Sequence, residues 1–268
     1  MKLTSVYAVQ PHEKIKLSDR ETSGAPKGLT HETAEPILAK RREQLSDLQE
    51  IMYAQQKHAV LIVLQGMDTA GKDGTISHIF SGVNPQGCSV ASFKVPTPLE
   101  ARHDFLWRAH NAVPPLGQIG IFNRSHYEDV LSPRVHKVIS GKTAERRLGL
   151  INDFESSLAD NGVMILKFFL HISQDEQTRR LQSRIDDPNK HWKLSEADFK
   201  ERKFWSEYQK AYEDILAGSS RKDAPWFIIP ADHKWMRNVA ISEILVDAFK
   251  SLKLEYPAPT MDASKIQL

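Results

Sequence analysis

The chain contains a single cysteine, Cys88, and no long apolar run. One cysteine cannot form an internal disulfide, and no Cys/His cluster has the ligand spacing of a zinc site. The longest uninterrupted apolar run, 59–64, is far shorter than the roughly 20 residues of a membrane-spanning helix, and the N-terminus lacks a signal-peptide pattern. We therefore expect a cytoplasmic protein that neither enters a membrane nor is exported.

A large excess of charge of one sign is also lacking. The 36 Lys and Arg residues face 34 Asp and Glu residues, which gives a formal net charge of +2. This balance argues against a globally basic nucleic-acid binder, so a polyanion would have to be bound by a local group of basic residues. With 40% hydrophobic and 26% charged residues, the composition resembles that of globular proteins and excludes a wholly disordered or fibrous chain.

Apolar segments and amphipathic segments alternate along the chain. Five apolar segments predict buried strands, at 60–65, 88–94, 119–122, 163–170 and 226–229. Helical patterns occur at 30–58, 72–83, 99–112, 143–161 and 234–252. This alternation predicts an α/β fold with a layered, five-stranded parallel sheet.

The same patterns predict one domain with an insertion. The expected parts are an N-terminal arm and long helix (1–58), a core (59–252) with an insertion at about 173–217, and a C-terminal tail (253–268). Within the first part, residues 1–28 show no sustained period and are expected to be extended or loosely attached. The insertion reads as two helices joined at 186–189, where Pro188 ends the first and Ser195 can cap the second.

The long helix carries an apolar stripe formed by Leu38, Leu45, Leu48 and Met52. These residues recur at helical spacing, so the stripe is expected to pack on the core or on another subunit. We therefore expect a homo-oligomer, either a dimer or a tetramer.

A glycine-rich loop follows the first predicted strand and precedes a helix. It reads Gly66-Met-Asp-Thr-Ala-Gly71-Lys72-Asp73-Gly74, a G-x-x-x-x-G-K pattern. The glycines let the backbone N–H groups turn inward, Lys72 reaches terminal phosphates, and the helix adds its positive end. The loop therefore predicts a phosphate site made of Gly66, Thr69, Ala70, Gly71, Lys72, Asp73 and Gly74. The alternative is a glycine-rich turn that arose by chance.

Two acids in this loop indicate a metal ion. Asp73 stands where a Ser or Thr hydroxyl usually binds magnesium, and Asp68 would repel a phosphate unless a cation lay between them. Asn123 ends the third strand, where enzymes with a phosphate-binding loop of this kind usually carry an acidic residue that orients magnesium. The predicted ligands of Mg²⁺, or of Mn²⁺, are thus Asp68, Asp73 and Asn123, with Glu128 as a further carboxylate. Alternatively, Asp68 only bonds its own backbone, as Asp does in turns.

Several basic residues could bind phosphate. Arg124 follows the third strand at the edge where ligands bind in open α/β sheets. Arg180 and Arg184 lie four residues apart in the insertion, where mobile arginines could close over a transferring phosphoryl group. The segment 130–144 has no acid and includes Arg134 and Lys137. Each of these could instead have no role in phosphate binding. Arg124 could be an ordinary surface arginine, 130–144 a solvated loop, and Arg180 and Arg184 exposed helix residues paired with neighbouring acids.

With these residues in view, the chain resembles the type-2 polyphosphate kinases over about 30–252. The resemblance rests on the motifs 66–74, 93–96, 122–130 with 134–136, 180–184 and 188–193. It implies a thymidylate-kinase-like P-loop fold, a three-layer sandwich with a helical lid. It also implies magnesium-dependent, reversible transfer of phosphoryl groups from inorganic polyphosphate to adenine or guanine nucleotides.

The resemblance also implies roles for individual residues. Asp68, Lys72, Arg124, Glu128 and Arg184 fall on positions expected to act in catalysis, and Lys94 falls on one expected to bind phosphate. Asn123 together with Glu128 resembles the subgroup that accepts both AMP and ADP, which would carry AMP through ADP to ATP.

Two other functions are compatible with the same loop. One is an ATP-dependent kinase of a small metabolite, and the other is a polyphosphate-binding or nucleotide-binding protein without turnover. A GTPase-like switch is disfavoured because the chain has no Asn/Thr-Lys-x-Asp guanine-reading motif.

Overall fold

The computed structural model describes residues 3–262, and a parallel five-stranded sheet lies at its centre. The strands are β1 (Ala59–Gln65), β2 (Cys88–Ser92), β3 (Ile119–Asn123), β4 (Val163–His171) and β5 (Trp226–Pro230). Their order is β2-β3-β1-β4-β5, and neighbouring strands run parallel. All five predicted strands are confirmed. The central strand, β1, is buried along its whole length and leads into the glycine-rich loop.

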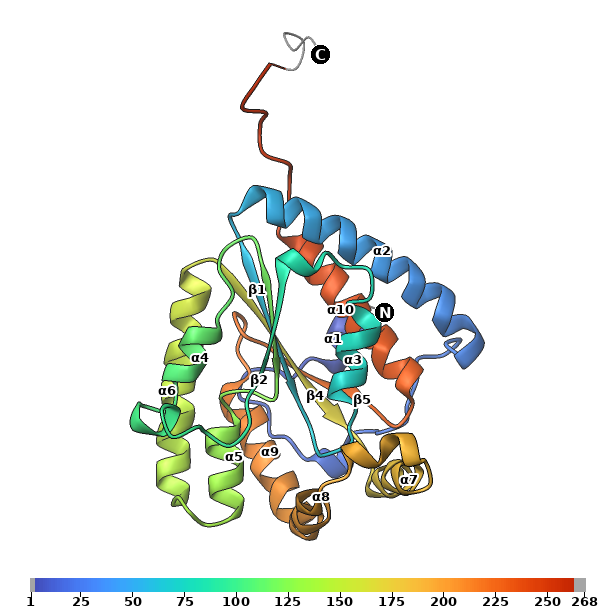
Figure 1. The fold of residues 1–268 in the computed structure, drawn as a ribbon, viewed down its shortest axis with the longest axis vertical. Helices are drawn as coiled ribbons and strands as arrows, with labels where there is room; N and C mark the ends of the chain where they lie inside the picture. Colours follow the sequence, from blue (N-terminus) through green and yellow to red (C-terminus); the bar gives the residue numbers. More distant parts are fainter. Residues whose placement is uncertain (1–2, 263–268) are drawn as a thin grey trace.

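Helices cover both faces of the sheet (Figure 1). On one side lie α2 (His31–Gln55), α3 (Lys72–Ile79) and α10 (Lys234–Ser251). On the other lie α4 (Trp107–Ala112), α5 (Glu128–Val135), α6 (Gly141–Asp160) and α9 (Trp205–Ser219). The three-layer α/β fold expected from the sequence is therefore confirmed.

The apolar stripe of α2 is covered inside the chain. Leu38, Leu45 and Met52 are buried, and Leu38 belongs to a small cluster with Val239 of α10. Of the two alternatives for this stripe, packing on the rest of the same chain is therefore the one observed. The stripe no longer supports self-association, and the oligomeric state stays a prediction.

Two segments, one expected to be a helix and one considered as a solvated loop, differ in the structure. The segment 99–112 is not one helix, because only a short 3₁₀ turn (Glu100–Arg102) and α4 form there. The Asp104 carboxylate accepts a hydrogen bond from the backbone N–H of Leu106 at 2.9 Å, and such local bonds compete with a continuous helix. Conversely, the segment 130–144 is not a simple loop, because α5 occupies its first part.

The insertion after β4 contains three α-helices rather than two. They are α7 (Gln174–Ile185), α8 (Glu196–Glu201) and α9, with 3₁₀ turns at Pro188–Lys193 and Arg202–Phe204. The Ser195 hydroxyl caps α8 by accepting from the Ala197 N–H, as expected for a cap at this position. The aromatic and apolar face of α9 is part of the main core, where Tyr208, Tyr212 and Ile215 are buried.

The expectation of a loosely attached N-terminal arm is wrong. The arm contains α1 (Leu3–Tyr7) and a 3₁₀ turn (Leu17–Asp19), and Leu3, Val9 and Leu17 are buried in the main core. The backbone N–H of Val9 donates to the carbonyl of Trp226 at 2.9 Å, and Ala8 forms an antiparallel bridge with Phe227. The arm therefore closes the free edge of β5.

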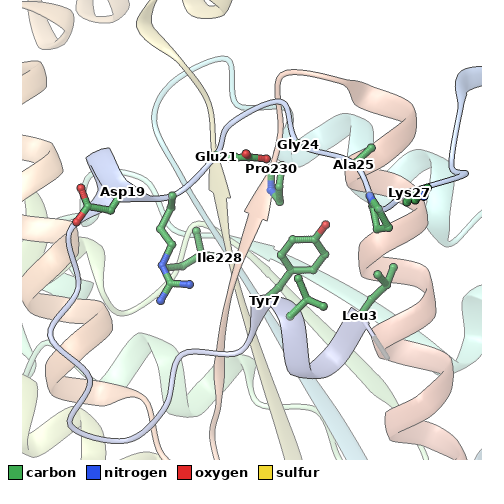
Figure 2. Close-up of a pocket in the computed structure, with 12 residues that line it drawn as sticks. Leu3, Tyr7, Asp19, Glu21, Gly24, Ala25, Lys27, Ile228 and Pro230 are labelled. Atoms are coloured by element: carbon green, nitrogen blue, oxygen red, sulfur yellow. The ribbon is translucent and has the colours of Figure 1, made fainter. Parts of the chain in front are cut away.

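A cavity of about 650 Å³ lies between this arm and β5 (Figure 2). Its lining includes Tyr7 from α1, Arg20 from the arm, and Ile228 and Pro230 from β5, but none of the residues predicted to bind phosphate or metal. Within residues 3–262, no helix is both long and apolar enough to cross a membrane.

Candidate active site

The glycine-rich loop joins β1 to α3 and turns as its sequence predicts. Gly66 has φ 152°, and a Cβ there would lie 2.8 Å from the carbonyl oxygen of Leu170 on the neighbouring strand β4. Gly71, with φ 102°, directly precedes α3. A side chain at position 66 would therefore meet backbone, so the tight turn needs glycine there.

Lys72 lies against the loop that precedes it. Its Nζ donates hydrogen bonds to the carbonyls of Gly66 and Met67 at 2.8 and 3.3 Å. Burial, and next the charge of Arg124, lower the pKa of Lys72 below its usual value. The ammonium group thus lies within the electrostatic reach of the arginine that was predicted to share its site.

Two side-chain contacts connect the loop to the carboxyl end of β3. Arg124 Nη2 donates to Asp68 Oδ1 at 2.8 Å, and Asn123 Nδ2 donates to Asp73 Oδ1 at 2.6 Å. Arg124 adopts a left-handed backbone conformation with φ 60°, and its N–H bonds the carbonyl of Leu64 in β1. The structure therefore brings together four residues that lie on two separate segments of the sequence.

Glu128, the first residue of α5, lies beside the same group. Burial raises its pKa above the usual value, although the charges of Arg124 and Lys72 oppose this effect. A half-buried carboxylate facing two cations can orient a basic group or accept a metal ion.

Arg184 lies on α7, and the contacts of its guanidinium are within the insertion. Its Nη1 lies 3.5 Å from Asp198 Oδ2 and donates to the carbonyl of Lys193 at 3.2 Å. Burial, and next the charge of Asp68, raise the pKa of Asp198. Asp198, on α8, thus lies within electrostatic reach of the loop, and it was not predicted from the sequence. Its only local signal is an acid three residues after the helix-capping Ser195.

Arg180 lies behind the loop rather than in front of it. Its Nη1 donates to the carbonyls of Thr69 and Ala70 at 2.9 and 3.1 Å, and its Nη2 donates to those of Ala231 and Asp232. Its Nε pairs with Glu176 at 2.8 Å. With its donors used in this way, Arg180 holds the loop's backbone, which differs from the direct phosphate contact expected from the sequence.

The other expected phosphate ligands lie apart from this group. Arg134 pairs with Asp214 of α9, and the neighbouring His136 Nε2 lies 2.9 Å from Glu201 of α8. Lys94 and Lys137 are exposed. Acids from the insertion therefore face part of the basic segment 130–144, and no contact among the described residues links Lys94, Arg134 or Lys137 to the loop.

A fully buried polar network lies behind the Arg124 turn, and it too was missed. Lys167 Nζ of β4 donates to Glu155 Oε2 of α6 at 2.5 Å and to the Tyr127 hydroxyl at 2.9 Å. Glu155 Oε1 also accepts from the Tyr127 hydroxyl at 2.8 Å and lies 3.1 Å from His126 Nε2. Burial pushes the pKa of Glu155 upward, but Lys167 and His126 outweigh it and hold that pKa below its usual value. A lysine inside the apolar segment 163–170 was the signal that a buried acid must pair with it.

The acidic residues fit a hard cation that is shared with a substrate. Asp68 and Asp73 place two carboxylates on one loop, and Asn123 adds an amide beside Asp73. Within residues 3–262, no three His, Cys, Asp or Glu residues are close enough to bind a metal on their own. A hard divalent cation held by only one or two carboxylates completes its coordination with water and phosphate oxygens.

A strand, a glycine-rich loop with lysine, a helix and converging arginines define the class of P-loop phosphotransferases. The family model described as Polyphosphate kinase 2 (PPK2) matches residues 28–257. The chain belongs to this family, whose phosphotransferases generally use a divalent metal.

Proteins similar to this chain cover nearly all of it. It is 47% identical over 262 residues to the AMP/ADP-polyphosphate phosphotransferase of Meiothermus ruber, covering 97% of this chain and 98% of that protein. It is 44% identical over 269 residues to the ADP-polyphosphate phosphotransferase of Rhodopseudomonas palustris, covering 96% and 93%. The crystal structure of Polyphosphate Kinase 2 from Arthrobacter aurescens TC1 superposes with a TM-score of 0.95 at 39% identity, covering 98% of this chain and 94% of that one.

Proposed function

We propose that this protein transfers phosphoryl groups reversibly between inorganic polyphosphate and adenine nucleotides, converting AMP to ADP and ADP to ATP, with guanine nucleotides as further acceptors. The observation that carries this proposal is the joining of the glycine-rich loop to the end of β3 through Asp68 and Arg124 at 2.8 Å. The near full-length similarity to an AMP/ADP-polyphosphate phosphotransferase supports the choice of substrates.

The transfer itself needs positioning and charge neutralisation more than proton abstraction. The acceptor is an ionised phosphate, so its oxygen attacks the terminal phosphorus of polyphosphate in line, and the bond to the next bridging oxygen breaks. Lys72 and Arg124 lie where they can neutralise the charge on the moving group. Arg184, from α7, would add a third positive charge on closing over the phosphates, and in this structure it pairs with Asp198.

Magnesium, with manganese as a substitute, would be held by Asp68, Asp73 and Asn123. When bound, such an ion neutralises phosphate charge and orients the phosphate oxygens. Asp68 also orients Arg124 through their ion pair. Removing divalent cations with EDTA is expected to abolish turnover, and adding Mg²⁺ or Mn²⁺ back is expected to restore it. Full turnover in EDTA would contradict the metal proposal.

An assay with polyphosphate, Mg²⁺ and AMP alone tests the function. We expect ADP to appear first and ATP to follow. ADP without any ATP would refute the second step, and no product would refute the reaction. Replacing polyphosphate with ATP and a panel of small acceptors distinguishes the rival metabolite kinase, which would need ATP as its donor.

A further inference from the structure

A buried arginine without an acidic partner lies directly behind the glycine-rich loop. Arg237, near the start of α10, is only 2% exposed. Its Nη1 donates to the carbonyl of Ala70 at 3.2 Å, and its Nε and Nη2 donate to Asn238 Oδ1 at 3.1 and 2.9 Å. Among residues 3–262 no carboxylate forms an ion pair with it, and burial, with Arg180 next, lowers its pKa to about 9. A buried positive charge thus faces only neutral oxygen acceptors.

The loop fits closely around this guanidinium. A Cβ at Gly71 would lie 1.9 Å from Arg237 Nη1, and a Cβ at Gly74 would lie 3.5 Å from its Nη2. The glycine at 71 therefore allows the backbone to pass directly over a charged group. A larger residue at 71 would be strained by the left-handed backbone and would also force the Arg237 guanidinium to move.

The arginine also fixes one peptide group of the loop. The carbonyl of Ala70 accepts from Arg180 Nη1 at 3.1 Å as well as from Arg237. Because a trans peptide is planar, the N–H of Gly71 points away from both guanidinium groups. That direction leads to the opposite side of the loop, where the first N–H groups of α3 lack partners within the helix.

The two arginines differ in how their charge is balanced. Arg180 pairs with Glu176 at 2.8 Å, but Arg237 has no such partner within the described part of the chain. Leaving a buried charge unpaired is costly, and an anion bound on the other face of a thin glycine loop would offset that cost. Polyphosphate is such an anion, so this step rests on the proposed function.

We propose that Arg237 is a positioning residue for polyphosphate, whose buried charge is balanced only when phosphate occupies the loop. It orients the 70–71 peptide and attracts the anion through the loop without touching it. The unpaired charge therefore lowers the stability of the ligand-free protein, and bound phosphate removes this effect.

Calorimetric titration with tripolyphosphate and Mg²⁺, in the absence of nucleotide, tests the proposal without turnover. The Arg237→Gln variant keeps a hydrogen-bond donor but loses the charge. We expect it to bind tripolyphosphate roughly 10- to 30-fold more weakly, the effect of removing one unit charge from a partly buried site. Its melting temperature without ligand should equal or exceed that of the parent, and its rise on adding tripolyphosphate should be smaller.

Two further variants sharpen the result. Arg237→Lys keeps the charge, so its affinity for tripolyphosphate should stay within a few-fold of the parent. Arg41→Gln is the control. Arg41, on α2, pairs at 2.9 Å with Glu243 of α10, the helix that also carries Arg237, and no contact among the described residues links Arg41 to the loop. This control should bind as tightly as the parent.

Three results would overturn the proposal. The first is parent-like binding by Arg237→Gln. The second is a loss of stability in that variant that is equal with and without ligand, or a failure to fold, since either would make Arg237 an ordinary structural support. The third is weak binding by Arg237→Lys. A parent protein that neither binds tripolyphosphate nor makes ATP would instead refute the proposed function.

Discussion

The site has two halves, the glycine-rich loop and the turn at Arg124 after β3, and a buried cation lies behind each. The two cations differ in whether a carboxylate neutralises them. Lys167, behind the Arg124 turn, lies 2.5 Å from the carboxylate of Glu155 and donates to two further oxygens. Arg237, behind the glycine-rich loop, pairs with no carboxylate among residues 3–262 and donates to two neutral oxygens. One cation is neutralised within the fold, whereas the other is left for the ligand to neutralise. The Lys167 network is thus a support that does not depend on ligand, whereas the stability of the loop around Arg237 is expected to depend on bound phosphate.

The largest expected effect comes from breaking the neutralised side. Glu155→Gln leaves Lys167 buried without a carboxylate, and breaking such a pair costs about 3–5 kcal/mol of unfolding free energy. Urea denaturation measures this loss. Arg237→Gln removes a buried cation without breaking an ion pair, so it is the matched contrast and should lose little or nothing.

The double variant Glu155→Gln with Lys167→Met completes that comparison. It removes both charges, so it should recover much of the stability lost in the single variant. If Glu155→Gln alone costs less than about 1 kcal/mol, the size of an exposed pair, the description of a tightly coupled buried network is wrong.

The second effect concerns the ion pair that links the two halves. Asp68→Asn should lower turnover by roughly 100-fold or more, the usual effect of losing one well-placed electrostatic group. Stability should change by less than about 1 kcal/mol, because the side chains of Asp68 and Arg124 are 25% and 41% exposed. Steady-state kinetics and urea denaturation measure the two effects. Turnover within a few-fold of the parent would remove Asp68 from the mechanism.

The smallest expected effect is a difference in how Glu155 and Glu128 contribute to stability at acid pH. The pKa of Glu155 in the folded protein is lowered, so its stabilising contribution is present above its unfolded pKa and is lost as pH falls through the folded value. The pKa of Glu128 is raised by burial, so its ionised form costs stability at neutral pH, and this cost disappears as pH falls through its folded value.

Variants at these two positions should therefore diverge. Glu128→Gln should be more stable than the parent at pH 7, by about 1 kcal/mol, the size of most single substitutions. That advantage should disappear toward acid pH. The deficit of Glu155→Gln should shrink only at lower pH. Stability curves measured from pH 7 to pH 4 test this, and parallel curves for the two variants would contradict the assigned directions.

The sequence predicted the local features well and the long-range ones poorly. The strands, the glycine-rich loop and its lysine follow from patterns within about ten residues. Arg237 and Ala70 lie 167 residues apart, so no local pattern indicates their contact. Arg180 and Arg184 share a helix, yet Arg180 donates to the loop's backbone and Arg184 pairs with Asp198 of α8, because the path of the chain after α7 decides their surroundings.

The pairing of Lys167 with Glu155 was also not predicted, but here the sequence contained a signal. It interrupts an apolar strand, and a buried lysine requires a partner. Glu155, next to the buried Phe154 on the preceding helix, was within reach of that argument. Asp198 had no comparable signal, because an acid in an exposed helix is ordinary.

The docking of the N-terminal arm has a practical consequence for anyone who trims the chain. The family model begins at residue 28, so a fragment cut to this range would still contain every residue that the model matches. It would nevertheless lose Leu3, Val9 and Leu17 from the main core and expose the outer strand β5. An uncovered, apolar outer strand favours aggregation. The range matched by the family model therefore leaves out part of the main core of this protein.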